Sequence, residues 1–158
     1  MPRYPITPEG LQKLRAEFRR LIDVDRPNVV LAIEVARAHG DISENSEYED
    51  AKHRQGLIEG RIREVEDKLS NAEVIHPEKL KSDKVMFGAT VSVEDIDTGE
   101  KATYTILGAE EVDSKRGRIS VESPMGKALL GKMMGDEVSF IAPKGRRTVE
   151  ITEIRYGV

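Results

Sequence analysis

The feature that most constrains the fold is a heptad repeat in the first half of the chain. Its positions alternate in steps of three and four residues, and all but one of them carry apolar or aromatic side chains. They are Tyr48, Ala51, Gln55, Ile58, Ile62, Val65, Leu69 and Ala72. Such steps place the side chains on one face of a helix, where they form a seam for a second helix. The repeat therefore predicts a long helix that packs along its length against a partner.

The partner is expected in the preceding segment, where apolar residues also recur at helical spacing. They form two series that are out of phase with each other: Leu11, Leu14, Phe18 and either Leu21 or Ile22, then Val29, Ile33 and Ala36. Pro27 lies inside this phase slip, and proline removes a backbone donor and collides with the preceding turn. We therefore predict a kink or short break near Asp25 and Arg26, in a helix that Thr7 caps and Pro8 begins.

The chain is expected to reverse direction between the two helices. Gly40 is placed to end the first helix, and Asp41 or Ser43 to cap the second, so only about three residues turn the chain. Such a short connection forces an antiparallel hairpin. Arms of about 30 residues at 1.5 Å per residue make a rod roughly 45 Å long, with its tip far from any core. Gly56 and Gly60 lie inside the second arm, and nothing in the sequence explains them.

Beyond about Lys84 the apolar residues alternate with period two, which predicts strands. The expected strands are residues 85–96, 102–107, 118–122, 137–141 and 148–155, with turns at Asp97-Thr98-Gly99 and Lys144-Gly145. Between the third and fourth strands, Ser123 and Pro124 predict the capped start of a short helix that runs to about Leu130 and ends at Gly131.

Together these patterns predict an α+β protein of two domains. An N-terminal antiparallel α-helical coiled-coil hairpin would span residues 1–76, and residues 77–84 would be a polar linker. A small bent antiparallel sheet with one short helix would span residues 85–158.

Composition excludes several classes of function. There are 25 Lys and Arg against 29 Asp and Glu, a net charge of −4, which rules out a polycationic nucleic-acid coat. The absence of Cys removes disulfides and thiolate metal sites, and three scattered His residues do not make a metal site. No Ser-His-Asp arrangement or Gly-rich phosphate loop occurs. No apolar run approaches the roughly 20 residues that span a bilayer, so we expect a soluble cytoplasmic protein with no membrane partner.

The expected tip of the hairpin is strongly acidic. Five carboxylates fall within residues 41–50, and Asp41 and Glu44 have the spacing of a capping box, so helix capping is one explanation. The same spacing lets both carboxylates turn toward one point beyond the tip, where they would bind a cation. Two carboxylates cannot complete the octahedral oxygen shell of Mg²⁺, so such a site would need oxygens from a partner protein or a nucleic-acid phosphate.

Residues 40–52 resemble the tip of the bacterial transcript cleavage factors of the Gre family, and so do residues 59–62 and 69–75. Residues 87–91 and 119–124 match the same family, so the resemblance covers nearly the whole chain. It implies an FKBP-like C-terminal domain that docks on RNA polymerase, with the hairpin inserted into the secondary channel of the enzyme. There Gre factors stimulate the polymerase's own cleavage of the extruded RNA 3′ end in backtracked complexes. The factor itself is then not an enzyme.

The resemblance also assigns roles to individual residues. Asp41 and Glu44 match the two acidic tip residues that help to hold a second Mg²⁺, which is shared with the polymerase and not bound by the free protein. Ser43 matches a tip position implied to touch the attacking water or the RNA, with helix capping as the competing role. Arg37 and Lys52 lie where the family contacts extruded RNA.

Other residues have a structural explanation that competes with a functional one. Ser123-Pro124 matches the family's polymerase-docking segment, and helix capping explains it equally well. Tyr48 fits the seam, so packing is preferred to base stacking. For three arginines on the second arm a solvated helix face is the preferred interpretation: Arg54, Arg61 and Arg63.

Three alternatives remain at this stage. The first is a relative that occupies the polymerase channel and inhibits without stimulating cleavage. The second is a prolyl isomerase, which the small number of aromatic residues in the second half makes improbable. The third is a coiled-coil dimeriser, which is disfavoured because the hairpin satisfies its own seam. We expect the free protein to be a monomer.

Overall fold

The computed structural model describes residues 3–39 and 46–157. The chain divides into two compact units, which are described separately. The first unit comprises Met1–Tyr4 and Leu11–Ala72, and the second comprises Pro5–Gly10 and Glu73–Val158. The expected boundary at residue 76 had placed residues 5–10 with the hairpin. They belong to the second unit because Thr7 and Gly10 contact Glu111, a residue about a hundred positions later in the chain.

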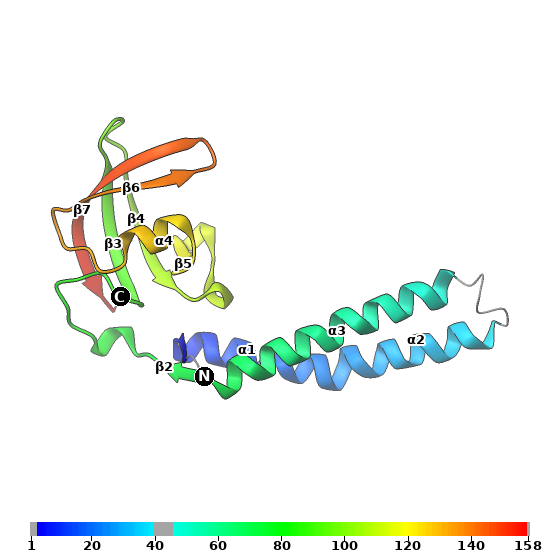
Figure 1. The fold of residues 1–158 in the computed structure, drawn as a ribbon. Coiled ribbons are helices and arrows are strands. Elements are labelled where there is room, and N and C mark those ends of the chain that lie inside the picture. The colour runs from blue at the N-terminus through cyan, green and yellow to red at the C-terminus, as the bar shows by residue number, and fades with distance from the viewer. Residues whose placement is uncertain (1–2, 40–45, 158) are drawn as a thin grey trace. The chain divides into compact units, whose positions relative to one another are not determined.

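Three α-helices build the two arms of the hairpin (Figure 1). The first arm consists of α1 (Pro8–Arg20), a π-helical turn at Leu21–Asp25 and α2 (Arg26–Ala38). The second arm is α3 (Ser46–Ser70), which runs alongside α2 in the opposite direction. Thr7 caps α1 as expected, since its Oγ1 accepts a hydrogen bond of 3.1 Å from the backbone N–H of Gly10.

The α-helix is interrupted at Leu21–Asp25, beside the position where a kink or short break was expected, but the chain stays helical because a π-helical turn joins α1 to α2. The backbone N–H of Arg26 donates to the carbonyl oxygen of Leu21, five residues back instead of four. Pro27 follows directly, in the first turn of α2. The ring of a proline collides with the carbonyl four residues before it, here that of Asp23, and a wider turn relieves such a collision. The phase slip in the sequence is therefore absorbed by one extra residue in the helix.

The heptad seam is confirmed. From α3 it buries Ala51, Ile62 and Val65, and its remaining members are half-buried. The first arm supplies the facing buried side chains: Leu14, Leu21, Val29, Ile33 and Ala36. The pattern of steps thus identified the buried face of both arms.

A two-stranded sheet was not expected from the sequence. It pairs β1 (Tyr4–Ile6) with β2 (Ala72–Val74). The backbone N–H of Tyr4 donates to the Asn71 carbonyl at 2.8 Å, and that of Ile75 to the Ile6 carbonyl at 2.8 Å. Three-residue strands are too short to show an alternating pattern, which explains why they were missed.

The second unit contains a five-stranded sheet in the order β5-β4-β3-β7-β6. Its strands are β3 (Ala89–Asp95), β4 (Lys101–Leu107), β5 (Arg118–Ser120), β6 (Glu137–Ala142) and β7 (Gly145–Tyr156). All neighbours are antiparallel except β4 and β5, which are parallel, so the expectation of a wholly antiparallel sheet was wrong. The chain between these two strands runs through short 3₁₀ turns at Ala109–Glu111 and Ser114–Arg116, and so re-enters the sheet in the same direction.

The core of this unit lies between the curved sheet and the short helix α4 (Pro124–Leu129). Alternate residues of β3 are buried, among them Val91 and Val93, and Leu129 of α4 meets them with no exposed surface. Gly131 follows α4 in the left-handed conformation, with φ of 80°. The α+β class, the helical hairpin and the bent sheet with one short helix are confirmed. In the part of the chain that the structure describes, no helix is both long and apolar enough to cross a membrane.

Candidate functional site

The sequence placed the functional centre at the hairpin tip, on Asp41, Ser43 and Glu44. These three residues lie outside the described residues, and their roles stay predictions. The structure describes the two arms that lead to them, since α2 ends at Ala38 and α3 begins at Ser46. The functional residues expected on these arms can therefore be located.

Two contacts join the arms at their described ends. The guanidinium carbon of Arg37 lies 5.9 Å from the centroid of the Tyr48 ring, a cation–π distance. Nε2 of His39 lies 3.7 Å from a carboxylate oxygen of Glu47. Tyr48 is half-buried at the seam, in agreement with a packing role, while Arg37 stays exposed. Arg37 is thus held in place by an aromatic ring and keeps its charge at the surface.

Lys52 occupies the second turn of α3 and is exposed. Its Nζ donates to Oε1 of Gln55 at 3.2 Å, a contact within one helix face. Lys52 and Arg37 are both exposed cations within about two turns of the described ends of their arms, as the sequence indicated. Contact of either residue with RNA remains a prediction.

A groove between α2 and α3 lies near the same ends of the arms. Leu31 and Val35 line it from α2, with 57% and 51% of their surface exposed, and Asp50 and Arg54 line it from α3. Other aliphatic side chains are more exposed, among them Leu57 at 62% and Ile141 at 75%, so exposure alone assigns no function to this groove. The heptad seam gives no sign of this groove, because Leu31 and Val35 lie on a second face of α2.

Ion pairs between the arms were also missed. Arg26 donates twice to Glu59, through Nε at 2.8 Å and Nη2 at 2.7 Å. This contact lowers the pKa of the Glu59 carboxyl and raises the pKa of Arg26, chiefly through its hydrogen bonds. Arg61 donates twice to Glu17, at 2.7 Å for both bonds. The interpretation of Arg61 as part of a solvated face was therefore wrong, because this side chain crosses to the first arm. Opposite charges beside the seam positions were the signal that could have indicated these pairs.

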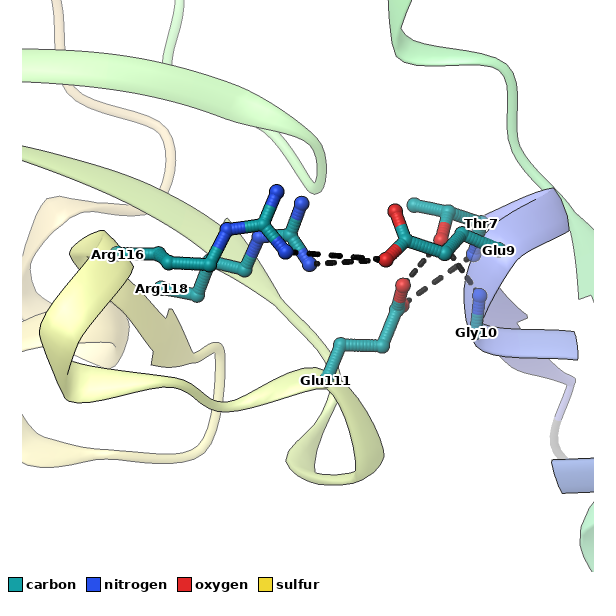
Figure 2. A network of polar contacts seen from close by, with 6 residues as sticks. All are labelled: Thr7, Glu9, Gly10, Glu111, Arg116 and Arg118. Atoms are coloured by element: carbon teal, nitrogen blue, oxygen red, sulfur yellow. Dashed lines mark hydrogen bonds and ion pairs between the residues drawn. The ribbon is translucent and has the colours of Figure 1, made fainter. Parts of the chain in front are cut away.

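The second unit contains a polar cluster around the carboxylate of Glu111, which is only 4% exposed (Figure 2). Thr7 donates to it twice, from its hydroxyl and, at 3.3 Å, from its backbone N–H. Gly10 allows this approach, since a Cβ at that position would lie 2.4 Å from Cδ of Glu111. The cluster holds residues 7–10 against the 3₁₀ turn at residues 109–111, and its role is structural.

Two arginines lie next to this cluster and face a single carboxylate (Figure 2). Oε1 of Glu9 lies 3.5 Å from Nη1 of Arg118 and 3.9 Å from Nη1 of Arg116. The adjoining cleft is lined by polar residues such as Thr90 and Thr103 together with Pro77 and Leu107, and none of its described lining residues is aromatic. Since the pocket of a prolyl isomerase is aromatic, this lining gives no support to isomerase activity.

Ser123 and Pro124 begin α4, where the sequence placed them. The Ser123 hydroxyl accepts from the backbone N–H of Gly126 at 3.0 Å and donates to the Ser120 carbonyl at 2.6 Å. Ser123 is half-buried and Pro124 is exposed. The capping role of Ser123 is confirmed, and a docking role for the pair remains a prediction.

Magnesium was expected only where a partner's carboxylates or a nucleic-acid phosphate complete its shell of oxygen ligands. Within residues 3–39 and 46–157, no group of three or more His, Asp or Glu side chains could hold a metal ion. The two tip carboxylates, Asp41 and Glu44, have the hard oxygen donors that Mg²⁺ prefers, but they are too few to complete its coordination shell.

One unit of the chain is a charged helical hairpin, and the other is a curled sheet with one short helix. These two parts define a class of protein, and comparison with known families supports the assignment for nearly the whole chain. The family model for the N-terminal part of transcription elongation factors GreA/GreB matches residues 4–74, and the model for their C-terminal part matches residues 80–156. The chain belongs to the GreA/GreB family of transcription elongation factors.

Similar curated proteins support the same family assignment. Transcription elongation factor GreA of Rhodospirillum rubrum is 55% identical over 157 residues, which cover 99% of this chain and 100% of that protein. GreA of Halorhodospira halophila is 52% identical, covering 99% of each chain. Among solved structures, GreA factor homolog 1 of Thermus thermophilus is 28% identical with a TM-score of 0.46, covering 97% of this chain and 99% of that one. The resemblance found in the sequence is confirmed, and the quoted curated relatives are GreA factors.

Proposed function

We propose that this elongation factor acts on bacterial RNA polymerase by inserting its hairpin into the secondary channel and stimulating cleavage of backtracked RNA. The observation that carries the proposal is the pair Asp41 and Glu44, placed where two long helical arms reverse. A narrow hairpin carries its end residues into a channel that a globular domain cannot enter. The factor supplies side chains to the catalytic centre of the polymerase and has no nuclease site of its own.

The tip carboxylates would act together with those of the polymerase. Together with those carboxylates, Asp41 and Glu44 would hold a magnesium ion, which would supply Lewis-acid stabilisation of the phosphate. Asp41 and Glu44 contribute oxygen ligands and accept hydrogen bonds from the attacking water, which orients it toward the phosphorus atom. Ser43 has a hydroxyl that can donate to the same water or to the RNA.

Arg37 and Lys52 would hold the extruded RNA by attraction to its phosphates. The Tyr48 ring already confines the Arg37 guanidinium, so less side-chain entropy is lost when a phosphate binds. Among the described residues, Lys52 donates to the amide oxygen of Gln55, which a phosphate can displace. We expect both residues to affect RNA affinity more than the chemical step.

Docking of the second unit on the polymerase would involve Pro124 more than Ser123. Both hydrogen-bonding capacities of the Ser123 hydroxyl are used within the chain, whereas the Pro124 ring is exposed. An exposed ring at the start of a rigid helix offers an apolar contact at little entropic cost. We further propose that the protein is a cytoplasmic monomer when free.

Two nearly isosteric substitutions test the catalytic role. Asp41→Asn and Glu44→Gln remove charge and keep size, so folding and polymerase binding should be unchanged. Cleavage of 5′-labelled RNA in stalled, backtracked complexes should fall about 100-fold or more, because metal binding and water orientation are both weakened. Glu49→Gln on the exposed surface of α3 is the matched control and should retain full stimulation.

Normal cleavage by both variants would contradict the assignment. Binding of the unmodified protein without any shortening of RNA would instead identify a channel-occupying inhibitor. Competition with a labelled factor for the polymerase measures binding separately and distinguishes these outcomes.

A further inference from the structure

The helix α2 carries two apolar faces, and only one of them is used. Val29, Ile33 and Ala36 are buried at the seam against α3. Leu31 and Val35, on the neighbouring face, are more than half exposed. A rotation that brought Val35 to the seam would also bring Asn28 and Ala32 there, so apolar burial favours the observed rotation of α2.

The π-helical turn decides which face is buried. The steps of three and four that run from Leu11 to Leu21 would continue, in an uninterrupted α-helix, to the positions Asp25, Asn28, Ala32 and Val35. A π-helical turn inserts one extra residue, so each later position moves forward by one. The positions that then face α3 are Arg26, Val29, Ile33 and Ala36, and this is the arrangement observed.

Arg26 thus occupies a seam position, where its partner Glu59 meets it with two short hydrogen bonds. The two side chains are 40% and 33% exposed. In the alternative phase Asp25 would face Glu59, and two carboxylates would repel each other. The Arg26–Glu59 pair therefore favours the observed rotation of α2, and repulsion between Asp25 and Glu59 disfavours the alternative rotation. Polar residues at seam positions select the register of coiled coils in the same way.

The part of the hairpin on the other side of the turn is held independently. Glu17 of α1 receives both hydrogen bonds of its pair with Arg61, which also lies 3.1 Å from Glu64. With α1 anchored to α3 in this way, a change of phase has to be taken up within Leu21–Asp25. The turn is bracketed by two bidentate pairs, one before it and one after it.

We propose that the π-helical turn and the Arg26–Glu59 pair form a register selector that sets the rotation of α2 and hence the direction of the tip side chains. One residue of slip rotates an α-helix by about 100°, and a helix transmits this rotation along its length. Ala38 lies 12 residues beyond Arg26, about 18 Å along the axis at 1.5 Å per residue. Arg26 and Glu59 are positioning residues for the cleavage reaction, a role that rests on the proposed function.

The first experiment separates positioning from binding in full-length protein. Glu59→Gln and Arg26→Gln should lower the maximal cleavage rate at saturating factor by about 10-fold to 100-fold, because the tip is misplaced. The concentration that gives half-maximal stimulation should stay within about twofold, since the docking unit is untouched. Glu34→Gln and Arg19→Gln, on exposed positions of the same arm, are the matched controls and should leave both quantities unchanged. Unchanged maximal rates in both test variants would overturn the proposal.

A charge swap distinguishes register selection from simple loss of an ion pair. The double variant Arg26→Glu, Glu59→Arg restores the attraction between positions 26 and 59. Asp25 can then pair with the new arginine at position 59 equally well, so the two rotations of α2 are no longer distinguished. We expect this double variant to recover thermal stability and to keep the low cleavage rate. Adding Asp25→Arg restores the discrimination and should restore the rate. Full cleavage by the double variant would show that only the ion pair matters and would overturn the selector.

A distance measurement tests the selector without any cleavage assay. The chain has no Cys, so Leu31→Cys and His53→Cys can be spin-labelled selectively. Both positions line the groove between α2 and α3, and rotation of α2 by about 100° changes their separation. One distance population is expected with Glu59 present and a second one after Glu59→Gln. A single unchanged population would overturn the selector, even where the Asp41→Asn and Glu44→Gln results uphold the proposed function.

Discussion

The hairpin and the second unit achieve stability in different ways. The hairpin is held by a narrow seam in which three of the seven heptad positions that lie in α3 are buried, and ion pairs cross between its arms beside that seam. The second unit encloses a cluster of ten buried apolar residues contributed by its sheet, α4 and the adjoining segments. Stability is therefore spread along the hairpin and concentrated in the second unit.

This difference suits two different tasks. A rod whose contacts are local can project a tip far from any core, because each turn of helix is supported by the turn beside it. A closed core holds a surface in one shape, as a docking surface requires. In the proposed register selector, Arg26 and Glu59 add to the apolar seam in setting the rotation of α2.

The largest expected effect on stability is the difference between two isoleucine-to-alanine substitutions, one in each unit. Ile151 is fully buried in the second unit, whereas Ile58 is half-buried at the seam of the hairpin. Ile151→Ala should lower the free energy of unfolding by about 2–5 kcal/mol, because it leaves a cavity in a closed core. Ile58→Ala should cost about 1 kcal/mol. Hydrogen exchange resolved by peptide measures the stability of each unit separately. Equal losses of unfolding free energy in the two variants would contradict the difference between the units.

A smaller effect is expected at Gly10 in the second unit. The added methyl of Gly10→Ala would displace the buried carboxylate of Glu111 and weaken its hydrogen bonds from Thr7. The expected loss is about 1–3 kcal/mol in the free energy of unfolding, measured by urea titration. In a Glu111→Ala background the same change should be neutral or stabilising, since alanine favours a helix over glycine. A loss in both backgrounds would contradict this explanation.

Gly56→Ala and Gly60→Ala should act in the opposite direction. A Cβ at Gly56 meets nothing within 4 Å, and one at Gly60 meets only the end of the Arg63 side chain at 3.9 Å. Each change should stabilise the hairpin by about 1 kcal/mol through helix propensity, seen as a higher melting temperature of the 222 nm signal. Nothing in the structure explains why glycine occupies these positions. Destabilisation by either alanine would show that the packing of α3 is tighter than described.

The smallest expected effect on stability appears only at acidic pH. Backbone N–H groups of Thr98 and Asp97, together with Arg147, lower the pKa of the buried Asp95. Its unfolded pKa is about 3.9, so the unfolded state binds the proton more readily. The stabilisation is complete above about pH 4 and is lost as the pH falls through the lower folded value.

Asp95→Asn should therefore weaken the acid-induced loss of stability in the second unit and leave that of the hairpin unchanged. Hydrogen exchange between pH 2 and pH 5 measures both units in one sample. Asp97→Asn in the same turn is the control, because its side chain is exposed. An unchanged acid response in the Asp95 variant would show that other carboxylates govern it.

The sequence by itself determined the features that depend on local chemistry. The heptad steps identified the seam, Thr7 and Ser123 were recognised as caps, and Asp97-Thr98-Gly99 was recognised as a turn. Each rests on contacts between residues a few positions apart, which spacing reveals directly. The roles of Asp41 and Glu44 stay predictions from the sequence, because these residues lie outside the described residues.

Only the tertiary structure decided the features that join distant residues. The parallel pairing of β4 and β5, the burial of Glu111 against Thr7 and the Arg26–Glu59 pair all depend on how separate segments meet. A charged residue has the same sequence signature whether it faces water or a partner across a seam. The π-helical turn shows this most clearly: the sequence contained the slip of one residue and the buried face of α2, but only the structure showed that a wider helical turn absorbs the slip.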